Sequence, residues 1–306
     1  MQAAQEYIGT RVVNVSSVPQ RSPFRYPGGK TWLVPYIRLW LRSVGGRTCE
    51  LIEPFAGGAI VSLTAVAENL VKRATLVELD EEVGAVWRVI LNGDGVKLAD
   101  DVAKFQMSLD AVKSVLAVQH RTLYDQAFAT LLKNRVQRGG ILAPGASLMK
   151  MGENGRGILS RWYPETLRRR ILTIVAMNDK IAFVQGDGMD VLRKNAGRSD
   201  AAYFIDPPYT IAGKRLYTHS TIDHEALFRI ADTLTGDFLM TYDSAKEIRW
   251  LAAKHGFDTV EIPMKNTHHA KKVELLVGRD LSWARVGTGG WPAQASRVSV
   301  PQKALG

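Results

Sequence analysis

Apolar runs alternate with amphipathic segments along most of the chain, in a pattern typical of an α/β fold. Short apolar runs predict seven strands, at residues 48–55, 73–80, 180–187, 201–206, 236–243, 257–264 and 271–280. Segments of helical period lie between most of them, at 82–91, 189–195, 224–234 and 245–255. Strands separated by helix-length segments favour a mostly parallel sheet. The last two runs have no helix between them and predict a C-terminal antiparallel hairpin.

The middle of the chain has a different pattern. Between residues 93 and 179 no run predicts a strand, and helical periods occur at 97–107, 109–118, 124–136 and from Pro164 onwards, around a Gly-rich loop. We therefore predict a helical insertion within a discontinuous α/β domain. The predicted parts are an N-terminal arm (1–22), the α/β domain (23–92 and 180–283), the insertion (93–179) and a flexible tail (284–306).

Composition narrows the class of partner. The 306 residues carry 40 Lys and Arg against 30 Asp and Glu, a formal net charge of +10. Such an excess favours an anionic partner, most often nucleic acid, although a basic solvated surface gives the same composition. Cys49 is the single cysteine, which excludes an intramolecular disulfide and a Cys-rich metal site and fits a reducing cytoplasm. No signal segment or membrane span is recognisable, so we expect a cytoplasmic protein.

The segment F-I-D-P-P-Y-T, residues 204–210, follows a buried strand directly. Prolines end strands, so a plain strand exit is one interpretation. However, Asp206 and the carbonyl of Pro207 offer two hydrogen-bond acceptors side by side, and Tyr209 offers an aromatic face for stacking. Two acceptors facing one –NH2 group suit an amide or an amino base, which favours a functional role.

Two glycine motifs precede this segment. In F-R-Y-P-G-G-K (24–30), two glycines before a lysine can bind an anion, although an ordinary turn before a helix has the same letters. In E-P-F-A-G-G-A (53–59), the glycines follow the first strand, where α/β sheets bind the polar end of a cofactor. Glu78 ends the next strand about 20 residues later, as a ribose-binding acid does; a surface acid is the alternative. Neither motif has P-loop or G-x-G-x-x-G spacing.

The three motifs, in this order, resemble those of the Dam-like adenine-N6 DNA methyltransferases. The resemblance covers about residues 22–280 and implies a Rossmann-like class I methyltransferase sheet with a helical target-recognition insertion. It implies S-adenosylmethionine as methyl donor, S-adenosylhomocysteine as product, no metal, and double-stranded DNA as substrate. It also implies a nucleoid-associated enzyme, monomeric or weakly dimeric, of a kind that can have a cognate restriction enzyme.

The resemblance assigns roles to matching positions. Asp206 and Pro207 would hold the target amino group, and Tyr209 would stack on the extruded base. The cofactor would contact Tyr26, Lys30, Phe55, Gly57, Gly58, Glu78, Asp187 and Asp206.

Two departures and a set of basic residues bear on specificity. Ala59 stands where many relatives have Gly or Ser, and N-R-V-Q-R-G-G-I-L-A-P-G (134–145) matches the N-R…N-G pattern of GATC-recognising enzymes only in part. Basic residues near this loop and after the D-P-P-Y segment predict DNA contacts: Lys133, Arg135, Arg138, Arg156, Arg161, Lys214 and Arg215.

The alternatives to a DNA adenine methyltransferase are an RNA or protein-amide methyltransferase and a non-catalytic DNA-binding relative. Methylation of amides is usually associated with Asn in place of Asp206, which argues against an amide substrate.

Overall fold

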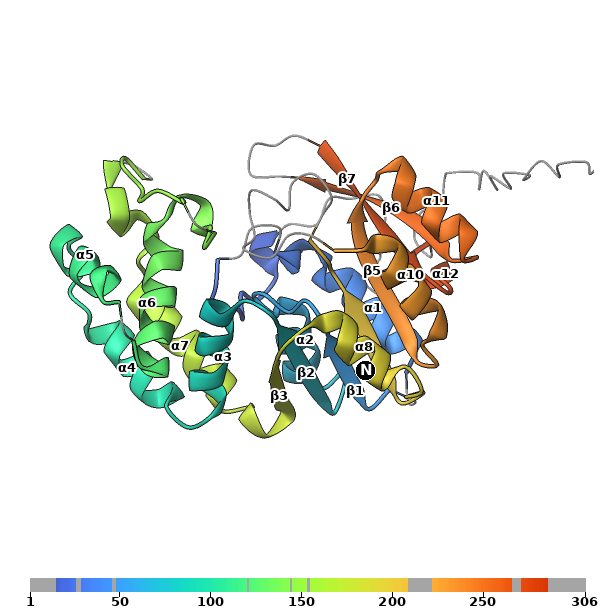
Figure 1. Ribbon diagram of the computed structural model, residues 1–306, viewed down its shortest axis with the longest axis horizontal. Coiled ribbons are helices and arrows are strands. Elements are labelled where there is room, and N and C mark those ends of the chain that lie inside the picture. Colours follow the sequence, from blue (N-terminus) through green and yellow to red (C-terminus); the bar gives the residue numbers. More distant parts are fainter. Residues whose placement is uncertain are drawn as a thin grey trace, which may run out of the picture.

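The computed structural model describes most of the chain and supports the predicted α/β architecture (Figure 1). It describes residues 15–25, 29–45, 48–119, 121–143, 145–152, 155–208, 222–265 and 271–285. Seven strands form one sheet: β1 (Glu50–Glu53), β2 (Arg73–Glu78), β3 (Ile181–Gln185), β4 (Ala201–Ile205), β5 (Asp237–Asp243), β6 (Asp258–Lys265) and β7 (Lys271–Gly278). All seven match the strands predicted from apolar runs.

The strand order is β3-β2-β1-β4-β5-β7-β6. The strands β3, β2, β1, β4 and β5 run parallel to one another. Ile52 of β1 lies beside Thr75 of β2 and Tyr203 of β4. β7 is antiparallel to both β5 and β6. The predicted C-terminal hairpin is therefore confirmed, and its second strand lies inside the sheet. This is the mostly parallel, Rossmann-like sheet with a C-terminal antiparallel hairpin that the sequence predicts.

Helices cover both faces of the sheet (Figure 1). The helices are α1 (Val34–Ser43), α2 (Ile60–Ala67), α3 (Glu81–Leu91), α8 (Gly188–Asn195), α10 (His224–Thr233), α11 (Lys246–Lys254) and α12 (Ser282–Arg285). Along β4, Tyr203 and Ile205 pack in one core with α8, α10 and α11, whereas Ala202 and Phe204 pack in the other core with α1 and α2. Because both faces are covered, β4 is apolar at every position rather than at alternate ones.

The described residues between α3 and β3 are helical apart from turns and one isolated bridge between Gln137 and Leu148. They form α4 (Gly95–Lys104), α5 (Leu109–Ala117), α6 (Leu123–Val136) and α7 (Pro164–Val175). A capping box between Thr122 and Asp125 begins α6. These helices extend to one side of the sheet and share a continuous core with α1 to α3 (Figure 1). Their description as a separate target-recognition domain stays a prediction. Among the described helices, none has the length and apolar character that crossing a membrane requires.

Candidate active site

The predicted site residues come from the carboxyl ends of neighbouring parallel strands. β1 runs into the glycine turn at 54–59, β2 ends at Glu78, and β4 runs into Asp206. Because β1 pairs in parallel with both β2 and β4, all three ends lie at one edge of the sheet. This is the edge at which open α/β sheets bind ligands.

The glycine turn has left-handed backbone at two positions. Gly57 has φ +45°, and Ala59, the residue before α2, has φ +49°. A non-glycine residue in this region costs about 1–2 kcal/mol, so glycine would fit position 59 with less strain than Ala59 does. Two hydrogen bonds hold the backbone of Gly57 in place. The N–H of Gly57 donates to Oε2 of Glu78 over 2.9 Å, and the carbonyl of Gly57 accepts from Nε1 of Trp87 over 3.0 Å.

Glu78 connects the glycine turn to the end of β2. Its Oε1 accepts the N–H of Asp80 over 2.9 Å, and Asp80 in turn caps the first turn of α3. Burial raises the pKa of Glu78 to about 7, and the Asp80 charge adds to this. Each carboxylate oxygen can accept a second hydrogen bond, which leaves acceptors for a diol. The ribose role predicted for Glu78 is therefore chemically feasible and stays a prediction.

Asp187 begins α8 rather than pointing into a buried pocket. Its carboxylate accepts the N–H of Met189 over 2.7 Å, as an N-cap residue does, and the residue is exposed. The next residue, Gly188, lies against the glycine turn: a Cβ at 188 would stand 2.1 Å from the carbonyl oxygen of Pro54. Gly188 thus lets α8 approach the turn closely.

Replacing Gly188 with Ala is expected to destabilise the protein by about 1–3 kcal/mol, because the clashing atom is backbone and cannot rotate away. The melting temperature should fall by several degrees. Gly186→Ala is the matched control, since a Cβ at 186 meets no atom within 4 Å. Equal melting temperatures for the two variants would contradict this account of the α8 contact.

Asp206 is held on both carboxylate oxygens. Lys30 Nζ lies 2.9 Å from Oδ2, and the Thr241 hydroxyl donates to Oδ1 over 2.7 Å. The Lys30 side chain is 4% exposed and that of Asp206 is 22% exposed, so part of Asp206 reaches solvent. Pro207 is buried behind it. The first and third sequence motifs therefore meet through an ion pair, which fixes the orientation of the Asp206 carboxylate.

Two further acids near Lys30 were not predicted. Glu274 of β7, 7% exposed, lies 3.2 Å from Lys30 Nζ. Glu53, at the end of β1, is buried and accepts the N–H of Ser62 over 3.0 Å. Burial raises the pKa of Glu53 to about 8, and the charge of Asp206 adds to this. An acid among buried apolar residues, as in V-E-L-L-V, is the signal that could have revealed Glu274.

Comparison with known proteins supports the resemblance seen in the sequence. Residues 26–133 match the family model of D12 class N6 adenine-specific DNA methyltransferases. This match confirms the predicted family resemblance over residues 26–30 of the first glycine motif, the second glycine motif, Glu78 and part of the helical region; it does not extend to Asp206. A search of curated proteins found no match.

Solved methyltransferase structures align with most of the chain at low identity. The rRNA methyltransferase aviRa from Streptomyces viridochromogenes is 11% identical, with 92% of this chain and 99% of that chain covered and a TM-score of 0.42. The tRNA methyltransferase TrmK from B. subtilis is 13% identical, with 78% and 64% covered and a TM-score of 0.34.

Four of the predicted site residues lie outside the described residues: Tyr26, Tyr209, Lys214 and Arg215. Phe55 is partly buried and packs against the core formed with α8 and α10. Gly58 is buried within the glycine turn. Contact of these residues with a cofactor or base stays a prediction.

The basic residues of the helical region fall into different environments. Arg138 and Arg156 are exposed, Arg161 is partly buried, and Lys133 forms an ion pair of 2.7 Å with Glu82. Arg135 is 6% exposed and donates to the carbonyl of Pro23. Its prediction as a surface DNA contact is therefore corrected: its guanidinium holds the segment before the first glycine motif.

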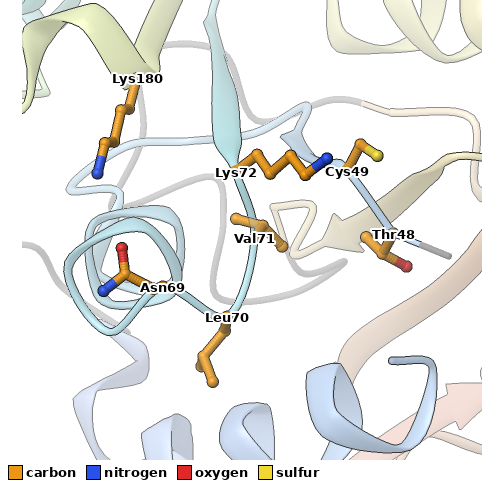
Figure 2. Close-up of a pocket in the computed structure, with 7 residues that line it drawn as sticks. All are labelled: Thr48, Cys49, Asn69, Leu70, Val71, Lys72 and Lys180. Atoms are coloured by element: carbon orange, nitrogen blue, oxygen red, sulfur yellow. The ribbon is translucent and has the colours of Figure 1, made fainter. Parts of the chain in front are cut away.

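A cavity of about 440 Å³ is lined by residues outside the candidate site. Figure 2 shows these lining residues. Its lining residues precede β1, β2 and β3: Thr48, Cys49, Asn69, Leu70, Val71, Lys72 and Lys180. It therefore lies at the amino ends of these strands and takes no part in the candidate site. Within the described ranges, no group of three His, Cys, Asp or Glu residues is arranged to hold a metal ion.

Proposed function

We propose that the protein is a DNA methyltransferase that modifies the exocyclic amino group of adenine after the base leaves the duplex. The observation that carries this proposal is the position of Asp206, oriented by Lys30 and Thr241 at the sheet edge that also holds the glycine turn. The D12 family match over residues 26–133 supports the same substrate class.

The polar groups and the glycine turn at this edge of the sheet suit S-adenosylmethionine. Glu78 supplies carboxylate acceptors suited to the ribose diol, and Gly57 and Gly58 provide a turn with little side-chain bulk. When bound, the cofactor supplies a methyl group on a positively charged sulfur. The sequence predicted that Lys30 contacts the cofactor, whereas its ammonium lies within 3.2 Å of two protein carboxylates, those of Asp206 and Glu274. We therefore assign Lys30 to Asp206 and Glu274 rather than to the cofactor.

Asp206 and the carbonyl of Pro207 accept the two hydrogens of the target amino group. Because Lys30 offsets much of the Asp206 charge, this carboxylate acts mainly as a directed acceptor. Two acceptors draw the nitrogen lone pair out of conjugation with the ring, towards the incoming methyl group. The nitrogen would form a bond to the methyl carbon while the bond from that carbon to the sulfur breaks, leaving S-adenosylhomocysteine, and the nitrogen would then lose one proton to solvent water. Extruding the base costs a few kcal/mol, which stacking on an aromatic side chain such as Tyr209 would offset.

The decisive experiment supplies purified protein with radiolabelled S-adenosylmethionine and, separately, unmethylated duplex DNA or RNA. We expect label on DNA, and single-molecule sequencing of the product should locate it at adenines. Label on RNA alone would identify the RNA-modifying alternative and reject the proposal. No label on either substrate, with DNA binding retained, would indicate a non-catalytic relative.

A further inference from the structure

Arginine side chains from three segments gather around residues 22–25. Arg135 of α6 donates to the Pro23 carbonyl, and Arg170 of α7 donates through Nη1 to the Ser22 carbonyl over 3.2 Å. The backbone of Arg25 is fixed by Asn134, whose side chain accepts its N–H over 2.8 Å and donates to its carbonyl over 3.0 Å. The arginine cluster, defined here as Arg25, Arg135 and Arg170, therefore has a well-ordered framework.

The charge of the arginine cluster is not neutralised within the described part of the protein. None of the three guanidiniums forms an ion pair with a described carboxylate, and the buried Nε of Arg135 has no hydrogen-bond partner there. Burial, together with the smaller effects of the Arg170 and Arg25 charges, lowers the pKa of Arg135 to about 9. A buried charge without a counter-charge is costly, so this arrangement favours binding of an anion.

The half-buried positions of Arg25 and Arg170 leave the cluster accessible to a ligand. Guanidinium groups match the geometry of phosphate oxygens and are weakly hydrated, which suits them to a partly buried phosphate. Lys30, which pairs with Asp206, is five residues along the chain from Arg25, so the Cα atoms of Arg25 and Lys30 are no more than roughly 18 Å apart. A duplex that presents a base at Asp206 would therefore pass close enough to bring a backbone phosphate to the cluster.

We infer that the arginine cluster binds one backbone phosphodiester of the duplex DNA substrate. This inference rests on the proposed function for the identity of the ligand. It assigns a role to Arg25 and Arg170, and it makes Arg135 the buried support of the site rather than a surface contact.

The test compares wild-type protein with Arg25→Gln in cofactor-free binding to a fluorescent 20-base-pair duplex at several salt concentrations. Gln keeps the backbone that Asn134 holds but removes the charge. We expect binding to weaken roughly tenfold. The slope of log K against log salt should become shallower by about 0.9, the value for one phosphate contact. Arg193→Gln is the matched control, because Arg193 pairs with Asp190 on the exposed side of α8 and should leave the slope unchanged.

A second measurement separates the site from the proposed function. Inorganic phosphate, compared with chloride at equal ionic strength, should raise the melting temperature of the wild type more than that of Arg25→Gln. Arg25→Gln should itself melt no lower than the wild type, since it removes one of several like charges. If Arg25→Gln showed the same phosphate protection and the same salt slope as the wild type, the proposed site would be overturned. If phosphate raised the melting temperature in a way that depends on Arg25, but the protein bound no duplex, the anion site would stand and DNA would be rejected as its ligand.

Discussion

Replacing Asp206 with Ala is expected to reduce kcat for methyl transfer by roughly 1000-fold or more, the scale at which directed hydrogen-bonding groups act in catalysis. The variant should fold, because Lys30 keeps Glu274 as a partner at 3.2 Å and its buried ammonium stays compensated. Cofactor affinity should persist, since Glu78 and the glycine turn are held by contacts that do not involve Asp206. A selective loss of kcat would identify an interaction made with the reacting group.

The control for this experiment is Asp200→Ala, at the opposite end of the same strand. Asp200 pairs with Arg198 near the protein surface, where solvent screens the pair and its contribution to stability is small. Its turnover should therefore match the wild type. Turnover of Asp206→Ala within about tenfold of the wild type, with the protein folded, would rule out the role assigned to Asp206.

The sheet and its candidate edge could be predicted because they depend on local patterns. Apolar runs such as A-A-Y-F-I predict buried strands, and an acid followed by prolines marks a strand end. The partners of Asp206 and Lys30 could not be predicted in the same way. Thr241 is 35 residues from Asp206 in the chain, and their contact depends on β5 lying beside β4. Glu274, the second partner of Lys30, lies on β7, which is brought near by its pairing with β5. An apolar pattern predicts β7 but not that it lies between β5 and β6.

The basic residues show a second limit of the sequence. Charge along α6 predicted a DNA-contacting surface, yet Asn134 and Arg135 are both buried. α6 contacts α3, α5 and the chain near residue 25, so it is enclosed on several sides and has no simple polar face. The N-R pair therefore holds Arg25 and Pro23 in place. Whether a charged side chain is buried depends on the neighbouring helices, which the local pattern does not specify.

Replacing Lys30 with Met is expected to impair both folding and catalysis. Removal of the ammonium would take away the cation that contacts both Asp206 and Glu274, close to buried Glu53. Breaking a buried ion pair by removing one partner costs about 3–5 kcal/mol, so the melting temperature should fall sharply. Asp206 would also lose one of the two contacts that orient it, and kcat should decrease by roughly 100-fold.

The double variant Lys30→Met/Glu274→Gln distinguishes the structural effect from the catalytic one. Neutralising Glu274 removes one of the two negative charges that Lys30 contacts in the wild type, so the double variant should recover part of the lost melting temperature. Its kcat should stay low, because Asp206 remains without its lysine. The cofactor-contact role that the sequence suggested for Lys30 predicts another outcome, a raised KM for S-adenosylmethionine with kcat near that of the wild type. Thermal melting together with steady-state kinetics on the single and double variants therefore decides whether Lys30 acts through Asp206 or on the cofactor.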